Sequence, residues 1–320
     1  MSVYNFADMP KVTIAMAVYK PNIDWFMEQL NSLNQQDYTG DIELLVWNDS
    51  PNDFEVESYL KHTITSMEFQ IFSDGQNHGP TIAFEKLTKI ATGDYIAYCD
   101  QDDIWLCEKL SKMVEFMQAN LEIAGCHCNI AFIDGEGNAI KGNFIQKKDL
   151  FGWNDYDWQF KKTLVQNKSY GCAIMIKTDA AKKAIPFSRH VYHDQWLALY
   201  AIQHGGYKFM EDVLIYHREH GANTTSRLVG IRTKADYYNK KLKREYLFFR
   251  EARARADNLG NFDEVLNWVK ARVKYKDKVT VATFFDLLRF AKIRWDVSFF
   301  ELLMPFLSEK MFEKIVSRIS

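Results

Sequence analysis

The sequence contains little cysteine and little proline, with 5 and 6 residues among 320. An odd number of cysteines without a C-x-x-C pair argues against a disulfide framework. Cys126 and Cys128 would point the same way from one strand, which leaves a metal site open. We prefer to interpret them, together with Cys99, Cys107 and Cys172, as small apolar residues buried in a protein of a reducing compartment.

Long apolar runs are absent as well. No stretch reaches the roughly 18 apolar residues that are needed to span a bilayer. The first ten residues, MSVYNFADMP, have neither the basic start nor the apolar run of a signal peptide. We therefore expect a cytoplasmic protein, and peripheral contact with the inner face of the plasma membrane stays open.

Neither sign of charge is in large excess, since the net charge is only −2. The distribution is uneven, because residues 227–279 hold 15 lysines and arginines against 7 acidic residues. A hydrophobic content of 47% excludes a disordered chain and supports a sizeable core. We predict an α/β catalytic domain over residues 1–225, followed by a basic, amphipathic helical region over residues 226–320.

Along the first part of the chain, apolar segments alternate with stretches whose apolar residues recur at helical spacing. The segments Lys11–Val18, Ile42–Trp47 and Tyr95–Cys99 have the composition of strands that are buried on both faces of a parallel sheet. A strand over Tyr170–Ile176 and a helix over His193–His204 are predicted further on, and Tyr207–Tyr216 is predicted as the last strand. This alternation indicates an α/β sheet, in which ligands bind at the carboxyl ends of the strands.

Acidic residues follow two of these strands. The strongest signal is Asp100-Gln101-Asp102-Asp103, directly after an apolar segment. Three carboxylates within four residues repel one another unless a cation gathers them, and their oxygens suit Mg²⁺ or Mn²⁺. The alternative is that Asp102 or Asp103 caps a helix that begins near Leu106. A cap needs only one carboxylate, so we prefer the metal site.

Several motifs together resemble one family. They are TIAMAVYK, LLVWNDS, Asn77-x-Gly79, ATGDYIAYCDQDDIW, YHDQW and REHGAN. In order and spacing they resemble the family 2 glycosyltransferases over roughly residues 11–225. The resemblance implies the GT-A fold, a Rossmann-like mixed sheet flanked by helices, with a nucleotide-sugar donor and a divalent metal. The form DQDDIW is similar to that of bacterial enzymes of surface polysaccharide synthesis, many of which use dTDP-rhamnose.

The resemblance also implies roles for residues at the motif positions. Asp102 would be the principal metal ligand, His220 would contact the metal or the diphosphate, and Asp194 would be the catalytic base. For His220 a structural role, and for Asp194 a helix cap, are the alternatives. The donor nucleotide would be bound by Val18, Tyr19, Asp49, Asn77, Gly79, Asp100 and Arg218, although Asn77 and Gly79 are also expected to shape a loop.

On the acceptor side the resemblance implies Trp105, His193 and Trp196, with the indole of Trp196 offered to a sugar face. Core packing is an equal alternative for Trp105. The chain departs from the family pattern in two motifs. The family commonly has Pro-Val-Tyr-Asn where this chain has Ala17-Val18-Tyr19-Lys20, and it often has paired aspartates where this chain has Asn48-Asp49. Both motifs lie in the nucleotide pocket, so the identity of the base stays open.

These residues predict inverting transfer of a sugar to a saccharide or a lipid-linked acceptor. A metal would offset charge on the leaving diphosphate, and one carboxylate base without a second nucleophile implies direct displacement. Rhamnose from dTDP-rhamnose is the first expectation, and a UDP-linked hexose is the next. A nucleotidyltransferase and a non-catalytic nucleotide- or sugar-binding module are the rival functions.

The basic helical region has two interpretations. It is either a solvated helical surface or a surface that contacts an anionic membrane, with Phe and Leu in the lipid and Lys and Arg at the headgroups. Binding to nucleic acid is not expected, because no module for it accompanies the basic residues.

Overall fold

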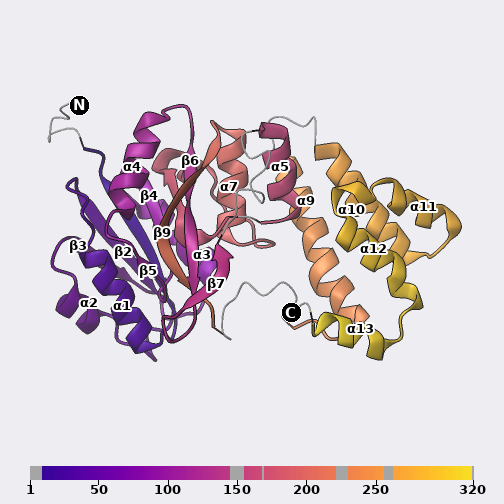
Figure 1. Ribbon diagram of the computed structural model, residues 1–320, viewed down its shortest axis with the longest axis horizontal. Coiled ribbons are helices and arrows are strands. Elements are labelled where there is room, and N and C mark those ends of the chain that lie inside the picture. Colours follow the sequence, from indigo (N-terminus) through magenta and orange to yellow (C-terminus); the bar gives the residue numbers. More distant parts are fainter. Residues whose placement is uncertain (1–8, 145–154, 168, 221–229, 256–261, 319–320) are drawn as a thin grey trace. The chain divides into compact units, whose positions relative to one another are not determined.

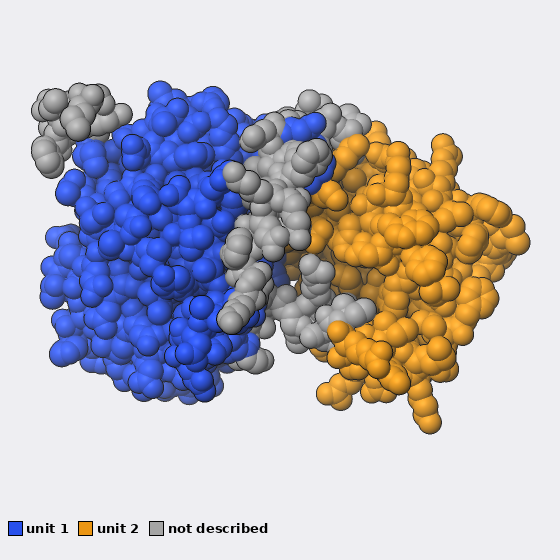
Figure 2. All heavy atoms as spheres, in the orientation of Figure 1, with its two compact units in different colours: residues 1–159, 168–187, 192–220 blue, residues 160–167, 188–191, 221–320 orange. Residues whose placement is uncertain are grey.

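The computed structural model describes residues 9–144, 155–167, 169–220, 230–255 and 262–318. The chain divides into two compact units (Figure 2). Unit 1 comprises residues 1–159, 168–187 and 192–220, and unit 2 comprises residues 160–167, 188–191 and 221–320. The predicted boundary after residue 225 falls among residues 221–229, outside the described part, so it stays a prediction.

Unit 1 is built on one mixed sheet (Figure 1). Its strands are β1 (Val12–Val18), β2 (Ile42–Asn48), β3 (Glu68–Phe72), β4 (Tyr95–Cys99), β5 (Ile104–Trp105), β6 (Gly125–Ile133), β7 (Ala139–Phe144), β8 (Ile174–Lys177) and β9 (Tyr207–Arg218). Among the described residues these nine strands are ordered β3-β2-β1-β4-β8-β6-β9-β5, with β7 beside β6.

The first four strands run parallel, so their carboxyl ends meet at one edge of the sheet. The chain order reverses at β1, which pairs with β2 on one side and β4 on the other. Strand β8 runs antiparallel to β4 and to β6, while β9 is parallel to β6 and antiparallel to β5. The reversal point is where ligands bind in open α/β sheets.

Helices cover both faces of the sheet. They are α1 (Ile23–Asn34), α2 (Glu57–Thr63), α3 (Pro80–Ile90), α4 (Lys109–Ala119), α6 (Thr178–Lys183) and α7 (His193–Gln203). Helix α5 (Tyr156–Val165) crosses the boundary between the two units. Helix α3 packs on β1 and β2 and contacts α6 and α7.

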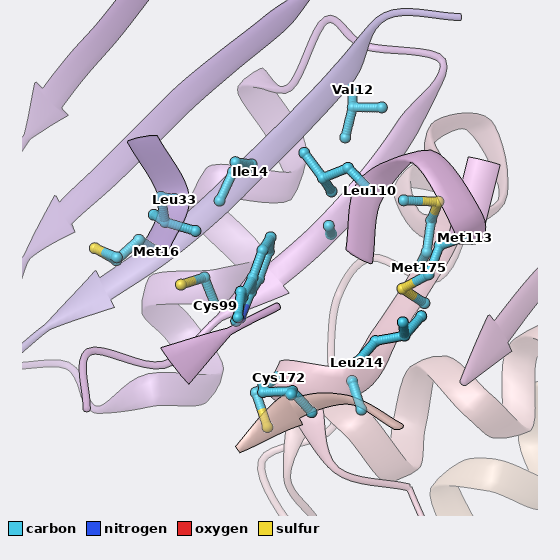
Figure 3. Packing of buried hydrophobic residues seen from close by; sticks show 14 of the residues in the cluster. Val12, Ile14, Met16, Leu33, Cys99, Leu110, Met113, Cys172, Met175 and Leu214 are labelled. Carbon is cyan, nitrogen blue, oxygen red and sulfur yellow. The ribbon is translucent and has the colours of Figure 1, made fainter. Parts of the chain in front are cut away.

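The alternation of side chains along β1 explains how the faces are filled. Val12, Ile14 and Met16 are fully buried in the main apolar cluster (Figure 3), together with residues of α1, α2 and α4. Thr13 and Ala15, which point to the other face, are fully buried too. A strand buried on both faces needs apolar or hydrogen-bonded residues at every position, and the unbroken run KVTIAMAV meets that need.

Unit 2 is helical, as predicted. It contains α8 (Lys234–Asp236), a π-helix over Tyr237–Leu242, α9 (Lys243–Arg255), α10 (Phe262–Asp277), α11 (Val281–Arg289), α12 (Trp295–Leu303) and α13 (Glu309–Val316). A small apolar cluster joins Tyr237, Met304 and Phe312. Within the described part of the chain, no helix is both long and apolar enough to cross a bilayer.

The secondary structure differs from the sequence prediction at two places near the site. Residues Gly171–Ala173 form a 3₁₀ turn, so the strand predicted from Tyr170 begins only at Ile174. Helix α4 begins at Lys109 instead of near Leu106, because Ile104–Trp105 pairs with β9 as a short strand. The acidic segment therefore leads into a strand and not into a helix.

Candidate active site

The carboxyl ends of β1, β2 and β4 bring the first predicted residues together. The main-chain N–H of Asp49 donates to the carbonyl of Val18 at 2.8 Å. The side chain of Gln101 accepts from the N–H of Tyr19 at 2.7 Å and donates to its carbonyl at 3.1 Å. Tyr19 itself is exposed. The loop after β4 is thus fastened to the loop after β1.

Asp49 is buried and organises the loop before α3. Its carboxylate accepts the indole N–H of Trp47 at 3.0 Å and the main-chain N–H groups of His78 at 3.0 Å and Gly79 at 2.7 Å. The side chain of Asn77 also accepts from the N–H of Gly79 at 3.0 Å. Gly79 has a positive φ of 77°, which glycine adopts at little cost. The structure therefore gathers Asp49, Asn77 and Gly79, and their contact with a nucleotide stays a prediction.

The acidic segment after β4 does not cap a helix. Glu108 occupies the cap position of α4, and the helix begins at Lys109. The buried carboxylate of Asp103 accepts Nδ1 of His217 at 2.8 Å and the main-chain N–H of Arg218 at 3.0 Å. These bonds tie the segment to the end of β9.

Asp102 and His220, the two predicted metal ligands, lie in direct contact. Oδ2 of Asp102 is 2.9 Å from Nε2 of His220, and both side chains are partly exposed. The His220 ring also lies against Trp25, with the ring centroids 4.7 Å apart. Residues 118 positions apart in the chain therefore meet at the same edge of the sheet.

Arg218, which is predicted to bind the donor nucleotide, is buried and bonded to the protein. Its guanidinium is buried, and Nε donates to the carbonyl of Asp102 at 2.9 Å. The other donors reach the carbonyl of Asp134 at 3.2 Å and the carboxylate of Glu28. Arg218 therefore holds the main chain of Asp102 in place, and its contact with the donor nucleotide stays a prediction.

The electrostatics of the segment favour a cation. Burial raises the pKa of Asp100 to about 8, and the neighbouring Asp103 and Asp102 add to the increase. Burial alone would lower the pKa of His217, but Asp103 and the other two carboxylates raise it to about 9. A raised pKa means that Asp100 is costly to ionise beside its neighbours. The residues present at this edge therefore fit a divalent cation, which would compensate that repulsion.

A second cluster lies beneath this edge. Asp103, Cys172 and His217 offer ligand atoms within 4.8 Å of one another. The buried ammonium of Lys109 donates to the carbonyl of Cys172 at 2.7 Å and lies 3.1 Å from the centroid of the Trp105 ring. Because Asp103 and His217 already bond to each other and Lys109 supplies a positive charge nearby, we interpret this cluster as an internal ion-pair network.

Asp194 lies close to the acidic segment. It is the second residue of α7, and the cap position before that helix belongs to Tyr192. Its side chain is buried and accepts the N–H of Gln195 at 2.6 Å. Burial and the neighbouring Asp103 and Asp102 are the main causes of the raised pKa of Asp100, and the charge of Asp194 adds a smaller increase. The helix-cap alternative does not describe this residue, and its role as a base stays a prediction.

The three residues expected on the acceptor side are buried. The indole N–H of Trp196 donates to the carbonyl of Ala184 at 2.9 Å, and Trp105 packs in the main cluster. His193 lies against the rings of Phe84 and Tyr98, at centroid distances of 4.1 Å and 5.4 Å, and burial lowers its pKa to about 3. These three side chains pack inside unit 1, and their contact with an acceptor sugar stays a prediction.

The sequence did not predict the supporting role of four residues that hold the site together. They are Gln101, Asp103, Lys109 and His217. The strand predicted to end at Tyr216 continues to Arg218 in the structure, so that His217 and Arg218 point to opposite faces of β9. For Lys109 the sequence held no signal, since a lysine in the first turn of a helix is ordinarily solvated.

Comparisons with solved structures show the fold. S. aureus TarS 1–349 in complex with UDP-GlcNAc superposes with a TM-score of 0.60 at 15% identity, covering 96% of this chain and 89% of that one. The mannosyltransferase PcManGT from Pyrobaculum calidifontis, in complex with GDP-Man and Mn²⁺, superposes with a TM-score of 0.54 at 14% identity. The superposition covers 98% of this chain and 86% of that one. The predicted GT-A fold, with a helical C-terminal region, is confirmed.

Curated relatives agree with this fold. An uncharacterised glycosyltransferase of Haemophilus influenzae is 34% identical over 143 residues, which are 44% of this chain and 55% of the relative. An uncharacterised glycosyltransferase of Methanocaldococcus jannaschii is 29% identical over 217 residues, which are 66% of this chain and 71% of the relative. A UDP-Glc:alpha-D-GlcNAc-diphosphoundecaprenol beta-1,3-glucosyltransferase of Escherichia coli is 25% identical over 53% of this chain and 62% of its own. The match thus spans little more than half of the Haemophilus protein.

The model of glycosyl transferase family 2 matches residues 13–182, more than half of the chain, and the chain belongs to that family.

Proposed function

We propose that this protein transfers a sugar from a nucleoside-diphosphate donor to an acceptor hydroxyl, with the help of a divalent metal and with inversion at the anomeric carbon. The observation that carries the proposal is the contact between Asp102 and His220 at one sheet edge. Asp100 precedes Asp102 by two residues in the chain and, besides burial, the charges of Asp102 and Asp194 help to raise its pKa. Family membership supports the reaction class, and the chemistry of these residues supports the proposed mechanism.

Asp102 and His220 would hold Mg²⁺ or Mn²⁺, with Asp100 beside them. When bound, the metal would neutralise the negative charge that grows on the departing diphosphate. Asp103, His217 and Arg218 keep the main chain around Asp102 in position through the bonds described above. The rigid support of a charged site lowers the cost of reorganisation during the reaction.

Asp194 is the proposed base. The acceptor hydroxyl is a weak nucleophile, and a carboxylate that takes its proton during attack raises its reactivity. The C–O bond to the diphosphate breaks as the new glycosidic bond forms, and the electron pair leaves with the diphosphate. One such displacement inverts the configuration at the anomeric carbon.

The donor and acceptor are proposed from the sequence resemblance and from the relatives. Rhamnose from dTDP-rhamnose is the first candidate donor, and a UDP-hexose is the second, since TarS was crystallised with UDP-GlcNAc and the Escherichia coli relative uses UDP-Glc. That relative acts on a saccharide linked to diphosphoundecaprenol. We therefore propose a lipid-linked saccharide as acceptor, a role in surface polysaccharide synthesis and peripheral contact with the inner membrane surface.

A thermal-shift panel with UDP, dTDP and GDP, each with and without Mn²⁺, tests donor binding. A nucleotide at about 100 times its dissociation constant stabilises the protein by about 2.7 kcal/mol. We expect stabilisation by one base class, and only in the presence of Mn²⁺. No stabilisation by any of the three would contradict the proposal. Transfer is then assayed with sugars of the preferred nucleotide, and NMR of the product reports the anomeric configuration.

A further inference from the structure

Exposed apolar side chains are concentrated on unit 2. Eight of the 13 large apolar residues that are exposed in the described chain fall between Val279 and Met311. Single exposed apolar residues are ordinary, but a contiguous group marks a surface that is covered by something else.

The group follows one side of α12 and of the 3₁₀ turn that continues it. Trp295, Phe299, Leu303 and Phe306 recur at helical spacing, with exposed fractions of 57%, 49%, 43% and 76%. The rings of Trp295 and Phe299 stack with their centroids 5.8 Å apart. The opposite side of α12 is buried through Ser298, Glu301 and Leu302. We call this row of four residues the α12 stripe.

A second, shorter row lies on α11, which packs against α12 (Figure 1). Val281 and Phe285 are exposed to 76% and 60%, one helical turn apart. The exposed Arg289 is one further turn along the same side, and the exposed Lys278 precedes the helix. Each row is therefore flanked by basic residues, since Lys292 precedes Trp295 and is 75% exposed.

The charges around these rows leave a positive surplus. Three of the four acidic residues of the segment form ion pairs: Asp286 with Lys274 at 3.7 Å, Asp296 with Arg294 at 2.6 Å and Glu301 with Arg272 at 2.7 Å. The exposed Glu309 accepts the uncharged main-chain N–H of Lys234 at 3.3 Å. Within the described residues, the exposed cations Lys278, Arg289 and Lys310 form no ion pair. An apolar surface with aromatic residues and free cations at its border is complementary to an anionic lipid headgroup layer.

We propose that the α12 stripe and the exposed side of α11 dock this protein on an anionic bilayer. Trp295, Phe299 and Phe285 enter the boundary between headgroups and acyl chains, and Lys278 and Arg289 lie among the lipid phosphates. This inference deepens the proposed function by specifying the contact with the membrane, but docking itself involves neither donor nor metal.

Sedimentation of the full chain with vesicles tests the proposal. We expect binding to vesicles of equal parts phosphatidylcholine and phosphatidylglycerol, and binding at least about tenfold weaker for the double variant Trp295→Ser/Phe299→Ser. Leu121→Ser is the matched control, because Leu121 is 70% exposed and belongs to unit 1. It should bind like the wild type. Equal binding of the double variant and the wild type would overturn the proposal, as would no binding of the wild type.

Two further measurements separate lipid from other partners. Tryptophan emission should shift to shorter wavelength with the anionic vesicles, and Trp295→Phe should lose most of that shift while it still sediments. Lys278→Glu/Arg289→Glu should lose at least about tenfold in affinity for the anionic vesicles. A dimer in light scattering that the double variant abolishes, without vesicle binding, would instead assign the surface to a second copy of the chain. Vesicle binding is measured without a sugar donor. A failure to bind vesicles would therefore contradict membrane docking and would not contradict sugar transfer.

Discussion

Asp102 and Asp103 are neighbours in the sequence but have different surroundings. Asp103 is fully buried between His217 and the main chain of Arg218, whereas Asp102 is partly exposed beside His220. Burial would raise the pKa of Asp103, but His217 and its hydrogen bonds lower it. The carboxylate of Asp103 is therefore fixed as an anion inside the protein, and that of Asp102 is available at the sheet edge.

Replacing Asp103 tests whether this residue supports the site without binding the metal itself. Asp103→Asn leaves His217 in a buried position without its anion, and breaking a buried pair costs about 3–5 kcal/mol. We expect that loss in the free energy of unfolding by urea, and weaker Mn²⁺ binding in the fraction that remains folded. Asp53→Asn is the control, because its pair with Lys20 is exposed on both sides. A loss as small as in that control, below about 1 kcal/mol, would contradict the assigned role.

The base assignment predicts a different pattern. Asp194→Asn should lower the rate of transfer by about 10²–10⁴-fold, because general base catalysis contributes that much, and should leave the affinity for the nucleotide unchanged. Asp179→Asn is the matched control, since Asp179 is an exposed aspartate in the first turn of α6. Single-turnover transfer and calorimetric titration measure the two effects. Transfer at the wild-type rate would remove Asp194 as the base.

At the scale of elements, a buried carboxylate joins β1, β2 and the turn before β4. Glu43 accepts from the hydroxyl of Thr13 at 2.5 Å, from the N–H of Thr92 at 2.7 Å and from Lys11 at 2.9 Å. The turn is tight, because a Cβ on Gly93 would lie 2.6 Å from the nitrogen of Thr13. The parallel strands are therefore locked together at the edge opposite the site.

This carboxylate makes the stability depend on pH. Burial alone would raise the pKa of Glu43, but its hydrogen bonds to Thr13, Thr92 and Lys11 lower it to about 2. A pKa lowered in the folded state stabilises above the unfolded value near 4.5, and the stabilisation is lost as the pH falls toward 2. We expect urea unfolding to show a loss of about 2–3 kcal/mol from this group over that range. Glu43→Gln should lack this component, and an identical pH profile in the variant would contradict the assignment.

The sequence predicts an element well where its burial has a simple pattern. Strands β1, β2 and β4 follow from apolar runs that are buried on both faces, and α7 begins at the predicted His193. The two-residue strand β5 has no such pattern, because its pairing with β9 depends on tertiary contact. The same contact decides that Asp102 and Asp103 precede a strand and not a helix.

At the scale of the whole molecule, each unit has its own buried core. In unit 2, Arg272 is buried, donates to Glu301 at 2.7 Å and 2.9 Å and to Glu245 at 2.7 Å, and lies over Trp268. A core of its own allows a unit to unfold separately.

We therefore expect Arg272→Ala to destabilise unit 2 by about 3–5 kcal/mol, because the buried carboxylate of Glu301 loses its cationic partner. Hydrogen exchange should show faster exchange in α10 and α12, while β1 and β4 of unit 1 keep their protection. Lys270→Ala, at an exposed position of the same helix, is the control. Equal loss of protection in both units would show that they unfold as one.

The motif residues of the site were predictable, but their surroundings were not. Asp102 lies beside His220, and the carboxylate of Asp49 accepts the N–H of Gly79, while the roles that the resemblance implies for them stay predictions. Burial of Trp105, His193 and Trp196, and the engagement of Arg218, depend on which face each element turns toward the core. A motif preserves residue types and spacing, whereas the face that is buried follows from packing between elements distant in sequence.

The central claim is that the acidic segment after β4 holds a divalent cation at the donor diphosphate. The most direct measurement is a titration with Mn²⁺, followed by electron paramagnetic resonance in the presence of the preferred nucleoside diphosphate, for the wild type and for Asp102→Asn. We expect one bound Mn²⁺ in the wild type and an affinity at least about 100-fold weaker in the variant, because a direct ligand is lost. The same Mn²⁺ affinity in both proteins would contradict the central claim.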